Sequence, residues 1–443
     1  MVTESGARSP PGQAIPWRQD HRRLCGTRGT KGETTSKQAD QAPSAAPERP
    51  IRRRPKNRRA QIAAEAAAAF GAHGYHGVSM DDIAKRLDIS STALYRHFPS
   101  KYALFREELL RLSGLALSAT ELPAEADDWS ARQRVEHVLD AIIGLTIANR
   151  PTVALVRWER RYLEPTDFDE LTAQFTAAIA ALRDLIGAVR PELDRRDLAI
   201  RAVSIFAVVS SIGDHHATVP AKALAPLLTA TSWALIDADL SHPDTAAPSA
   251  PAKEYYQPFK HDLLLRRAVE LFHERGYPNV SMEDIATAAD LSAASAVYRY
   301  YRSKSDLLVA AFRRAADRVS GAIAPAIAAA DGPAAALGTL IRLYVAGSFD
   351  ERALTFVYYA EFGHVDHADQ VTLRHLQQLI ITEWAKLVVA ARPELSLGEA
   401  RILVHAAFSL VVDLGRAFDD RICPQDTVIQ LLESILLGRP RTA

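Results

Sequence analysis

The feature that most constrains this 443-residue chain is a long internal repeat. When Phe70 is placed on Phe272, an offset of 202 residues, 11 of the 21 residues from Phe70 to Ser90 are identical to their counterparts. The same offset returns far downstream, where "VRPEL" (189–193) meets "ARPEL" (391–395). A repeat this long is the size of a whole domain or more, so the sequence predicts one unit of about 190 residues present twice.

The segment between the two units is typical of a linker. It reads "SHPDTAAPSAPA" (241–252), and its three prolines and small residues favour an extended spacer. Each unit also carries an aromatic and basic octamer, "LYRHFPSK" (94–101) and "VYRYYRSK" (297–304).

Apolar residues recur at helical spacing at the start of each unit, as in Ile62, Ala66 and Phe70. Gly74 and Gly276 are expected to end these first helices as C-terminal caps. Downstream, long segments rich in Ala, Leu, Val and Ile follow, without the alternation that marks strands. The predicted fold is therefore all-α, with two tandem helical units.

The repeated motif has the pattern of a helix-turn-helix. A helix starts after Ser79, a short turn falls at Asp88–Ile89, and Ser90 caps the next helix. In such motifs the second helix enters the major groove of DNA. Small side chains at its amino end, here Ser91 and Thr92, let the backbone approach base edges.

Other polar groups of the motif suit phosphate oxygens, including helix amino ends with free N–H groups. The residues expected to contact DNA are Ser79, Ser90, Ser91, Thr92, Tyr95, His97 and Lys101 in the first copy, Ser281, Ser295, Tyr298 and Lys304 in the second, and Arg52, Arg53 and Arg54 in the arm before the first copy.

That arm is strongly basic, although the net charge of the whole chain is zero. Residues 1–60 hold 14 Lys and Arg against 5 Asp and Glu. The composition before residue 48 favours disorder, whereas the arginine cluster around residues 52–59 favours contact with a polyanion.

These motifs resemble the DNA-binding signature of the tetracycline-repressor (tetR) family. The positions that match the signature are Phe70, Gly74, Tyr75, Ser79, Ile83, Ala84, Ser90, Leu94, Tyr95, Phe98, Lys101 and Leu104. The resemblance implies a homodimeric regulator of palindromic operators, usually a repressor, that a small molecule releases from DNA. It also implies a four-helix dimer interface built from the last two helices of each unit.

Two features depart from the family pattern. One chain carries two units, and the second motif has one extra residue, since Ser90 and Tyr95 are five positions apart but Ser292 and Tyr298 are six. Either the turn is longer or the second recognition helix presents another face.

A ligand is expected between the regulatory helices, where pockets are mostly apolar with a few polar groups. The candidate residues are Trp158, Glu159, Tyr162, Tyr358, Tyr359, Glu361 and His405. The stretch "HVDHAD" (364–369) contains metal-binding residue types, but no second ligand group has suitable spacing, so the sequence does not favour a metal cluster there. No metal and no cofactor are expected.

We therefore expect a basic arm (1–56), a helix-turn-helix domain (57–105), a regulatory domain (106–240), a linker (241–257), a second helix-turn-helix domain (258–308) and a second regulatory domain (309–443). The partners would be an imperfect-palindrome DNA operator and a small-molecule effector. The units would pair inside one chain, with a homodimer of chains as the rival arrangement.

The sequence also bears on other classes of protein. No phosphate-binding loop, nucleophile elbow or metal motif points to an enzyme. An architectural or ligand-independent DNA-binding protein, with the second unit as a degenerate pairing module, stays open. No apolar run is long enough for a membrane helix, no signal peptide is visible, and two cysteines fit a reducing, cytoplasmic setting.

Overall fold

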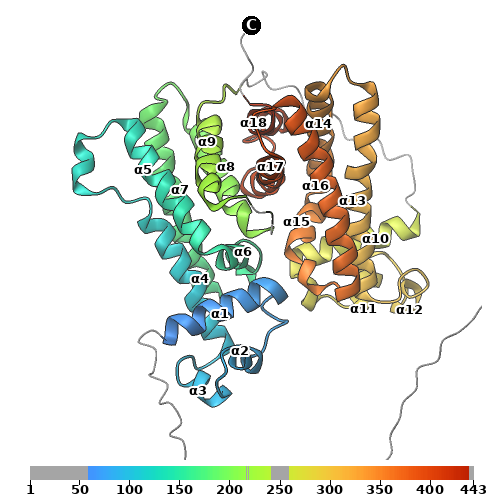
Figure 1. Ribbon diagram of the computed structural model, residues 1–443. Coiled ribbons are helices and arrows are strands. Elements are labelled where there is room, and N and C mark those ends of the chain that lie inside the picture. The colour runs from blue at the N-terminus through green and yellow to red at the C-terminus, as the bar shows by residue number, and fades with distance from the viewer. Residues whose placement is uncertain (1–57, 216, 218, 241–258, 439–443) are drawn as a thin grey trace, which may run out of the picture. The chain divides into compact units, whose positions relative to one another are not determined.

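The computed structural model describes residues 58–215, 217, 219–240 and 259–438, and within these ranges the regular secondary structure is entirely helical. The predicted arm (1–56) and linker (241–257), with Arg52, Arg53 and Arg54, lie outside the described residues. The expectation of an all-α fold with two tandem units is confirmed (Figure 1).

The helices of the second unit repeat those of the first in order. The first unit contains α1 (Arg58–His73), α2 (Met80–Arg86), α3 (Ser91–Tyr95), α4 (Lys101–Ser118), α5 (Ala131–Ala148), α6 (Arg150–Trp158), α7 (Pro165–Val189), α8 (Arg195–Ser210) and α9 (Ala221–Ile236). The second contains α10 (Lys260–Arg275), α11 (Met282–Ala288), α12 (Ala294–Val297), α13 (Lys304–Ala329), α14 (Pro333–Asp350), α15 (Arg352–Ala360), α16 (His367–Ala391), α17 (Leu397–Ala417) and α18 (Gln425–Leu436).

Short 3-10 segments complete the two units. They are η1 (Ala124–Asp128), η2 (Arg160–Tyr162) and η3 (Ser211–Gly213) in the first unit, and η4 (Tyr277–Asn279) and η5 (Phe362–His364) in the second. The helices α4 and α13 run through the predicted boundaries at 105/106 and 308/309. An unbroken helix therefore joins each helix-turn-helix to the bundle behind it.

Local sequence explains where the first helices stop and start. Gly74 and Gly276 adopt left-handed backbone with φ of 73° and 78°, where a side chain would be strained, and so end α1 and α10. Ser79 and Asp82 form a capping box at α2, and Ser281 and Asp284 form the same box at α11. Each cap contributes about 1 kcal/mol.

Each helix-turn-helix has a hydrophobic core of its own. Phe70 and Phe98 are fully buried in the first, and Phe272 and Phe312 in the second. Burying one such side chain stabilises the fold by about 1.5–3 kcal/mol. The two domains are therefore held together independently of each other.

The bundles behind them share a single core. Helices α8 and α9 of the first unit pack on α17 and α18 of the second, and one continuous cluster of buried residues includes Ile205, Leu228, Leu410 and Leu432 from these four helices. Figure 1 shows these helices meeting at the centre of the drawing. The two units are thus joined by buried apolar surface as well as by the chain.

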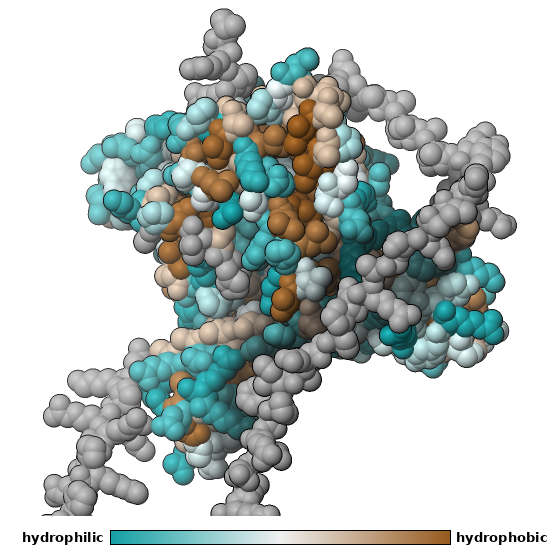
Figure 2. Space-filling view, turned by 45° about the vertical axis from the view of Figure 1, so that its right-hand side comes forward, coloured by the Kyte–Doolittle hydropathy of each residue, from teal (hydrophilic) through white to brown (hydrophobic). Residues whose placement is uncertain are grey.

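The outer surface is uneven in polarity. In Figure 2 the part that holds α1–α3, at lower left, is mostly hydrophilic, whereas hydrophobic side chains form a band over the helices above it. Within the described ranges no single helix is long and apolar enough to cross a membrane, and the pair α5–α6 reaches that length only with a bend of 93° between its members.

Candidate functional site

The recognition helix of the first copy, α3, presents a polar outer face. Thr92 is exposed and the Tyr95 side chain is 50% exposed, whereas Leu94 is fully buried and fixes the helix on the core. Ser91 is half-buried, and its hydroxyl donates a hydrogen bond to the carboxylate of Asp81 on α2. Two of the side chains predicted to contact DNA, Thr92 and Tyr95, are therefore accessible on one short helix.

The second recognition helix, α12, repeats this face. Ser295 is exposed and Tyr298 is 53% exposed, while Val297 is fully buried in the place of Leu94. The extra residue of the second copy falls in the turn, because α12 starts five residues after the C-cap Ala289 whereas α3 starts four after Leu87. A longer turn absorbs the insertion, and the helix keeps the same buried face.

The two recognition helices differ in how they begin. The Ser90 side chain accepts a hydrogen bond from the backbone N–H of Ala93 and so caps α3. Ala293 occupies the N-cap of α12, where no side-chain hydrogen bond is made. Because a missing cap costs about 1 kcal/mol, α12 is the less firmly fixed of the two.

The lysines predicted to contact phosphate are engaged within the protein. Lys101 donates from Nζ to the carbonyl oxygens of Tyr75 and Val78, both at 3.0 Å, and Lys304 does the same to Tyr277 and Val280 at 2.6 and 2.7 Å. Burial lowers the pKa of both lysines. Each lysine clamps the loop before the helix-turn-helix, and contact with DNA stays a prediction for both.

The remaining predicted contacts lie at the same end of their domains. Ser79 and Ser281 are exposed at the amino ends of α2 and α11. His97 is half-buried, and its carbonyl oxygen accepts a hydrogen bond from Arg59. None of these positions is excluded from solvent, so their assignment to DNA contact stays open.

Sequence reasoning missed two basic residues of this surface. Arg96 is the C-cap of α3, Arg299 follows Tyr298, the C-cap of α12, and both arginines are exposed beside the recognition tyrosines. The signal was available, because "YR" follows the buried residue in both octamers. Guanidinium groups so placed suit phosphate oxygens or base edges.

A cleft of about 670 Å³ opens between the two units. Five of the seven predicted ligand residues line it, namely Trp158, Glu159, Tyr358, Tyr359 and His405. Phe70, Gly71 and Gly74 at the end of α1 line it too, so the cleft touches the first helix-turn-helix domain directly. Its polar lining includes Arg374, Arg401, His375 and Gln377.

The other two predicted ligand residues lie elsewhere. Glu361 is fully buried, and neither it nor the half-buried Tyr162 lines the cleft. Glu361 accepts a hydrogen bond from the backbone N–H of Tyr277, at 2.9 Å. Tyr162 stacks near Tyr75, with ring centroids 6.1 Å apart. Both residues therefore connect a regulatory domain to a helix-turn-helix domain.

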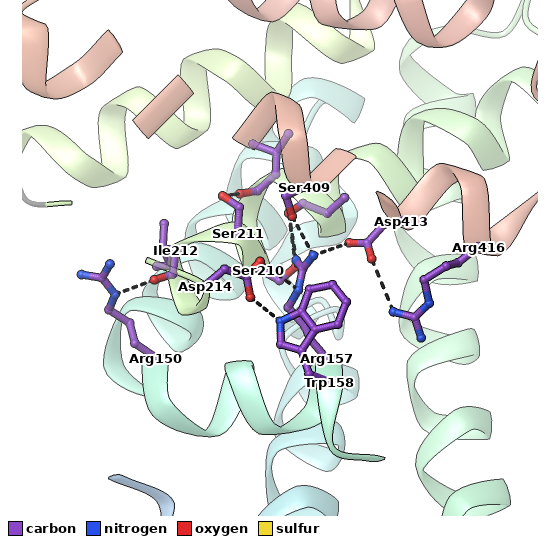
Figure 3. Close-up of polar contacts among 12 residues, drawn as sticks. Arg150, Arg157, Trp158, Ser210, Ser211, Ile212, Asp214, Ser409, Asp413 and Arg416 are labelled. Carbon is purple, nitrogen blue, oxygen red and sulfur yellow. Dashed lines mark hydrogen bonds and ion pairs between the residues drawn. The ribbon is translucent and has the colours of Figure 1, made fainter. Parts of the chain in front are cut away.

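A buried arginine stands at the junction of the two units (Figure 3). The guanidinium of Arg157 lies 3.4 Å from a carboxylate oxygen of Asp214 in its own unit and 2.9 Å from one of Asp413 in the other. It also donates a 2.6 Å hydrogen bond to Ser409. Burial raises the pKa of Asp214 to about 6, although the charge of Arg157 opposes this shift.

Aromatic rings close the same junction. The indole of Trp158 stacks on Tyr359 of the second unit with centroids 5.2 Å apart, and its N–H donates to Asp214 at 2.6 Å. His215 and His405 stack across the junction at 4.0 Å. The side chains that the sequence offered as ligand residues therefore also fasten the two units to each other.

Comparison with known families identifies both helix-turn-helix domains. Residues 62–107 and 264–311 match the family model described as "Bacterial regulatory proteins, tetR family". The matches cover α1 to the start of α4 and α10 to the start of α13. They confirm the predicted tandem duplication. Among curated proteins, none matches the chain.

Several solved structures are similar to part of the chain. They include TetR-family regulators from Bordetella parapertussis 12822 (18% identity, 41% of this chain and 96% of that chain, TM-score 0.38) and Rhodococcus RHA1 (22%, 41% and 98%, 0.36). The fatty acid degradation regulator FadR from Bacillus halodurans is also similar (19%, 42% and 98%, 0.37).

Proposed function

The chain is a tetR-type regulator with two tandem copies of the family's DNA-binding domain, and from this premise we propose that a single chain binds one operator with both domains. In this proposal α3 and α12 read the two halves of an imperfect palindrome. A small-molecule effector that enters the cleft between the units releases the protein from DNA, so the regulator acts as a repressor.

The observation that carries the proposal is the packing of α8 and α9 on α17 and α18 within one chain. A palindrome requires two recognition helices at a fixed separation, about 34 Å or a multiple of it. In relatives with one unit, as the family resemblance implies, two chains provide that separation. Here a continuous core between unlike units supplies the same rigid connection internally.

The polar residues of the junction favour unlike units over like ones. Arg157 reaches Ser409 and Asp413, whose counterparts in the first unit are Ala207 and Ser211. Two first units paired through this face would give the arginine no carboxylate across the junction. Arg157 would then keep only Asp214 of its own unit and lose the closer of its two carboxylate partners. Loss of a buried ion-pair partner is destabilising, so such a pairing is disfavoured.

The effector part of the proposal is supported by the position of the cleft. Its lining joins the end of α1 to α6 and to α15 and α16 of the other unit. A ligand there would contact the helix that carries the first DNA-binding domain and both units at once. It could therefore favour one relative placement of the domains over another by its differential affinity.

Sedimentation of the protein on a single operator duplex tests the pairing. Duplexes selected from a random pool would supply the operator, and we expect one chain per duplex. Tyr95→Ala and Tyr298→Ala should each weaken binding, the first more strongly. Two chains on one palindrome, with Tyr298→Ala without effect, would contradict the proposal.

The missing cap of α12 favours a second candidate, in which the second domain pairs with the first but does not contact DNA. Under it Tyr298→Ala leaves affinity unchanged while one chain still binds per duplex. Effector release is tested separately, by screening small molecules for an increase in melting temperature. A molecule that binds the cleft and leaves DNA affinity unchanged would argue against release.

A further inference from the structure

The second DNA-binding domain is fastened to the bundle through a buried glutamate. Glu361 follows α15, is fully buried and accepts a 2.9 Å hydrogen bond from the N–H of Tyr277, which follows the glycine that ends α10. Lys304 holds the carbonyl oxygen of the same Tyr277 at 2.6 Å. The placement of α10 relative to the bundle therefore depends on the Glu361 carboxylate.

That carboxylate is held by an arginine from the other unit. Arg161, in η2 of the first unit, ion-pairs with Glu361 at 2.8 Å and donates to the carbonyl oxygen of Ala360 at 3.2 Å. Its Nε lies 3.9 Å from where a side chain on Gly276 would begin. The guanidinium of the first unit thus lies against the hinge between α10 and η4 of the second.

Among the residues that the structure describes, no reciprocal contact is made. The counterpart of Arg161 in the second unit is Gly363, which has no side chain and lies with its backbone near His73 and Gly74. The carboxylate of Glu159, the counterpart of Glu361, is stabilised from within the first unit, by the charge of Arg161 and by a hydrogen bond from the backbone N–H of Tyr75. The ion pair at this part of the junction is therefore one-sided: the first unit supplies an arginine to the glutamate that holds the second domain, and the second unit supplies no arginine to Glu159.

We infer that Arg161 of the first unit is a positioning residue for the second DNA-binding domain, whose orientation it fixes through Glu361. No ion pair from the second unit fixes the first domain in this way among the described residues. The first unit would thereby set how α12 is presented. The inference concerns the free protein, and it bears on DNA through the proposed function.

Amide hydrogen exchange of the full chain tests it. Arg161→Met removes the charge while keeping the bulk, and we expect the amides of 277–285 to exchange at least tenfold faster. The amides of 75–83 should change less, because Arg161 reaches them only through Glu159 and Tyr162 of its own unit. Arg161→Lys should restore much of the protection. Arg190→Met is the matched control, because Arg190 pairs only with first-unit groups, Glu192, Asp239 and the carbonyl oxygen of Ile236, among the described contacts.

A general loss of stability would speed exchange in both segments to the same degree and would overturn the inference, as would unchanged exchange at 277–285. If Arg161→Met folds poorly, a double-mutant cycle with Glu361→Gln decides instead. It compares the effect of Arg161→Met on exchange at 277–285 in the two backgrounds, and glutamine keeps an acceptor for the N–H of Tyr277. Acting through Glu361, Arg161→Met should then have a smaller effect in the Glu361→Gln background. Equal effects in both backgrounds would contradict the inference.

Footprinting on the selected operator separates this inference from the proposed function. If exchange changes as expected and Arg161→Met also weakens protection of the half under α12, both hold. If exchange changes but neither half-site responds, the positioning role stands, and the proposal that the second domain contacts DNA fails.

Discussion

Glu159 and Glu361 occupy equivalent positions in the two units, and each stabilises the backbone N–H of a tyrosine just after the first helix of its DNA-binding domain. Across the described residues, an arginine ion-pairs with Glu361, whereas none does so with Glu159. The two copies thus share the residues that join each domain to its own bundle. They differ in the residues that face across the junction.

This difference shows what an internal pair can do that a symmetric dimer cannot. In a homodimer every contact across the axis occurs twice, so a charge on one side appears on the other. Within one chain, Arg157 can face Asp413 while its own counterpart is Tyr359. In a chain with two unlike units, each face of the junction can therefore change separately, so that the first unit pairs with the second and not with another first unit.

The largest effect is expected for the junction arginine. Arg157→Met should lower the free energy of unfolding by about 3–5 kcal/mol, because two carboxylates are left near each other without their buried countercharge. Tyr359→Phe, at the equivalent position, should cost only about 1 kcal/mol. Urea denaturation measures both, with the exposed Lys386→Met as control. Equal losses at the two positions would remove the asymmetry.

The glutamate pair gives a pH test. Burial raises the pKa of Glu159 from 4.5 to about 7. The folded state thus keeps a proton that the unfolded chain releases, and stability from this group is lost as pH rises from about 4.5 to about 7. Glu159→Gln should therefore become stabilising relative to wild type over that window, by on the order of 2 kcal/mol.

Glu361→Gln should act in the opposite direction at pH 8, because it deprives the buried Arg161 of its partner. Denaturation curves of both variants at pH 5 and pH 8 decide the point. If the two variants shift the free energy of unfolding in the same direction at pH 8, the ion pair with Arg161 does not make Glu361 behave differently from Glu159.

The recognition helices should differ in readout. Thr92→Ala should change base preference in one half-site by about 1 kcal/mol, or roughly fivefold to tenfold in affinity for the preferred base. Ser295→Ala should change the other half-site by less, because α12 lacks a side-chain cap. Binding selections with each variant measure this. A larger effect for Ser295→Ala would reverse the assignment of the stronger half.

The smallest effect concerns the caps. Ser90→Ala should destabilise the first domain by about 1 kcal/mol, whereas Ala293→Ser should stabilise the second by up to about 1 kcal/mol, since Ala293 already has the extended backbone of an N-cap. Hydrogen exchange in α3 and α12 reports each domain separately. No gain from Ala293→Ser would show that the longer turn, rather than the cap, limits α12.

Much of the fold follows from local sequence signals. The glycines that end α1 and α10, the capping boxes and the helix-turn-helix pattern all depend on residues within a few positions of one another. Such short-range preferences act in any context, which explains why the predicted helix ends at Gly74 and Gly276 and the predicted starts after Ser79 and Ser90 are observed.

The tertiary structure alone decided which helices face each other and which charges meet. Arg157 and Ser409 are 252 positions apart, and no periodicity relates Arg161 to Glu361. Only the tertiary structure shows that the ammonium of Lys101 donates to two carbonyl oxygens of the preceding loop, and its contact with phosphate stays a prediction. A donor binds the acceptor that packing brings within reach, and packing depends on the whole chain at once.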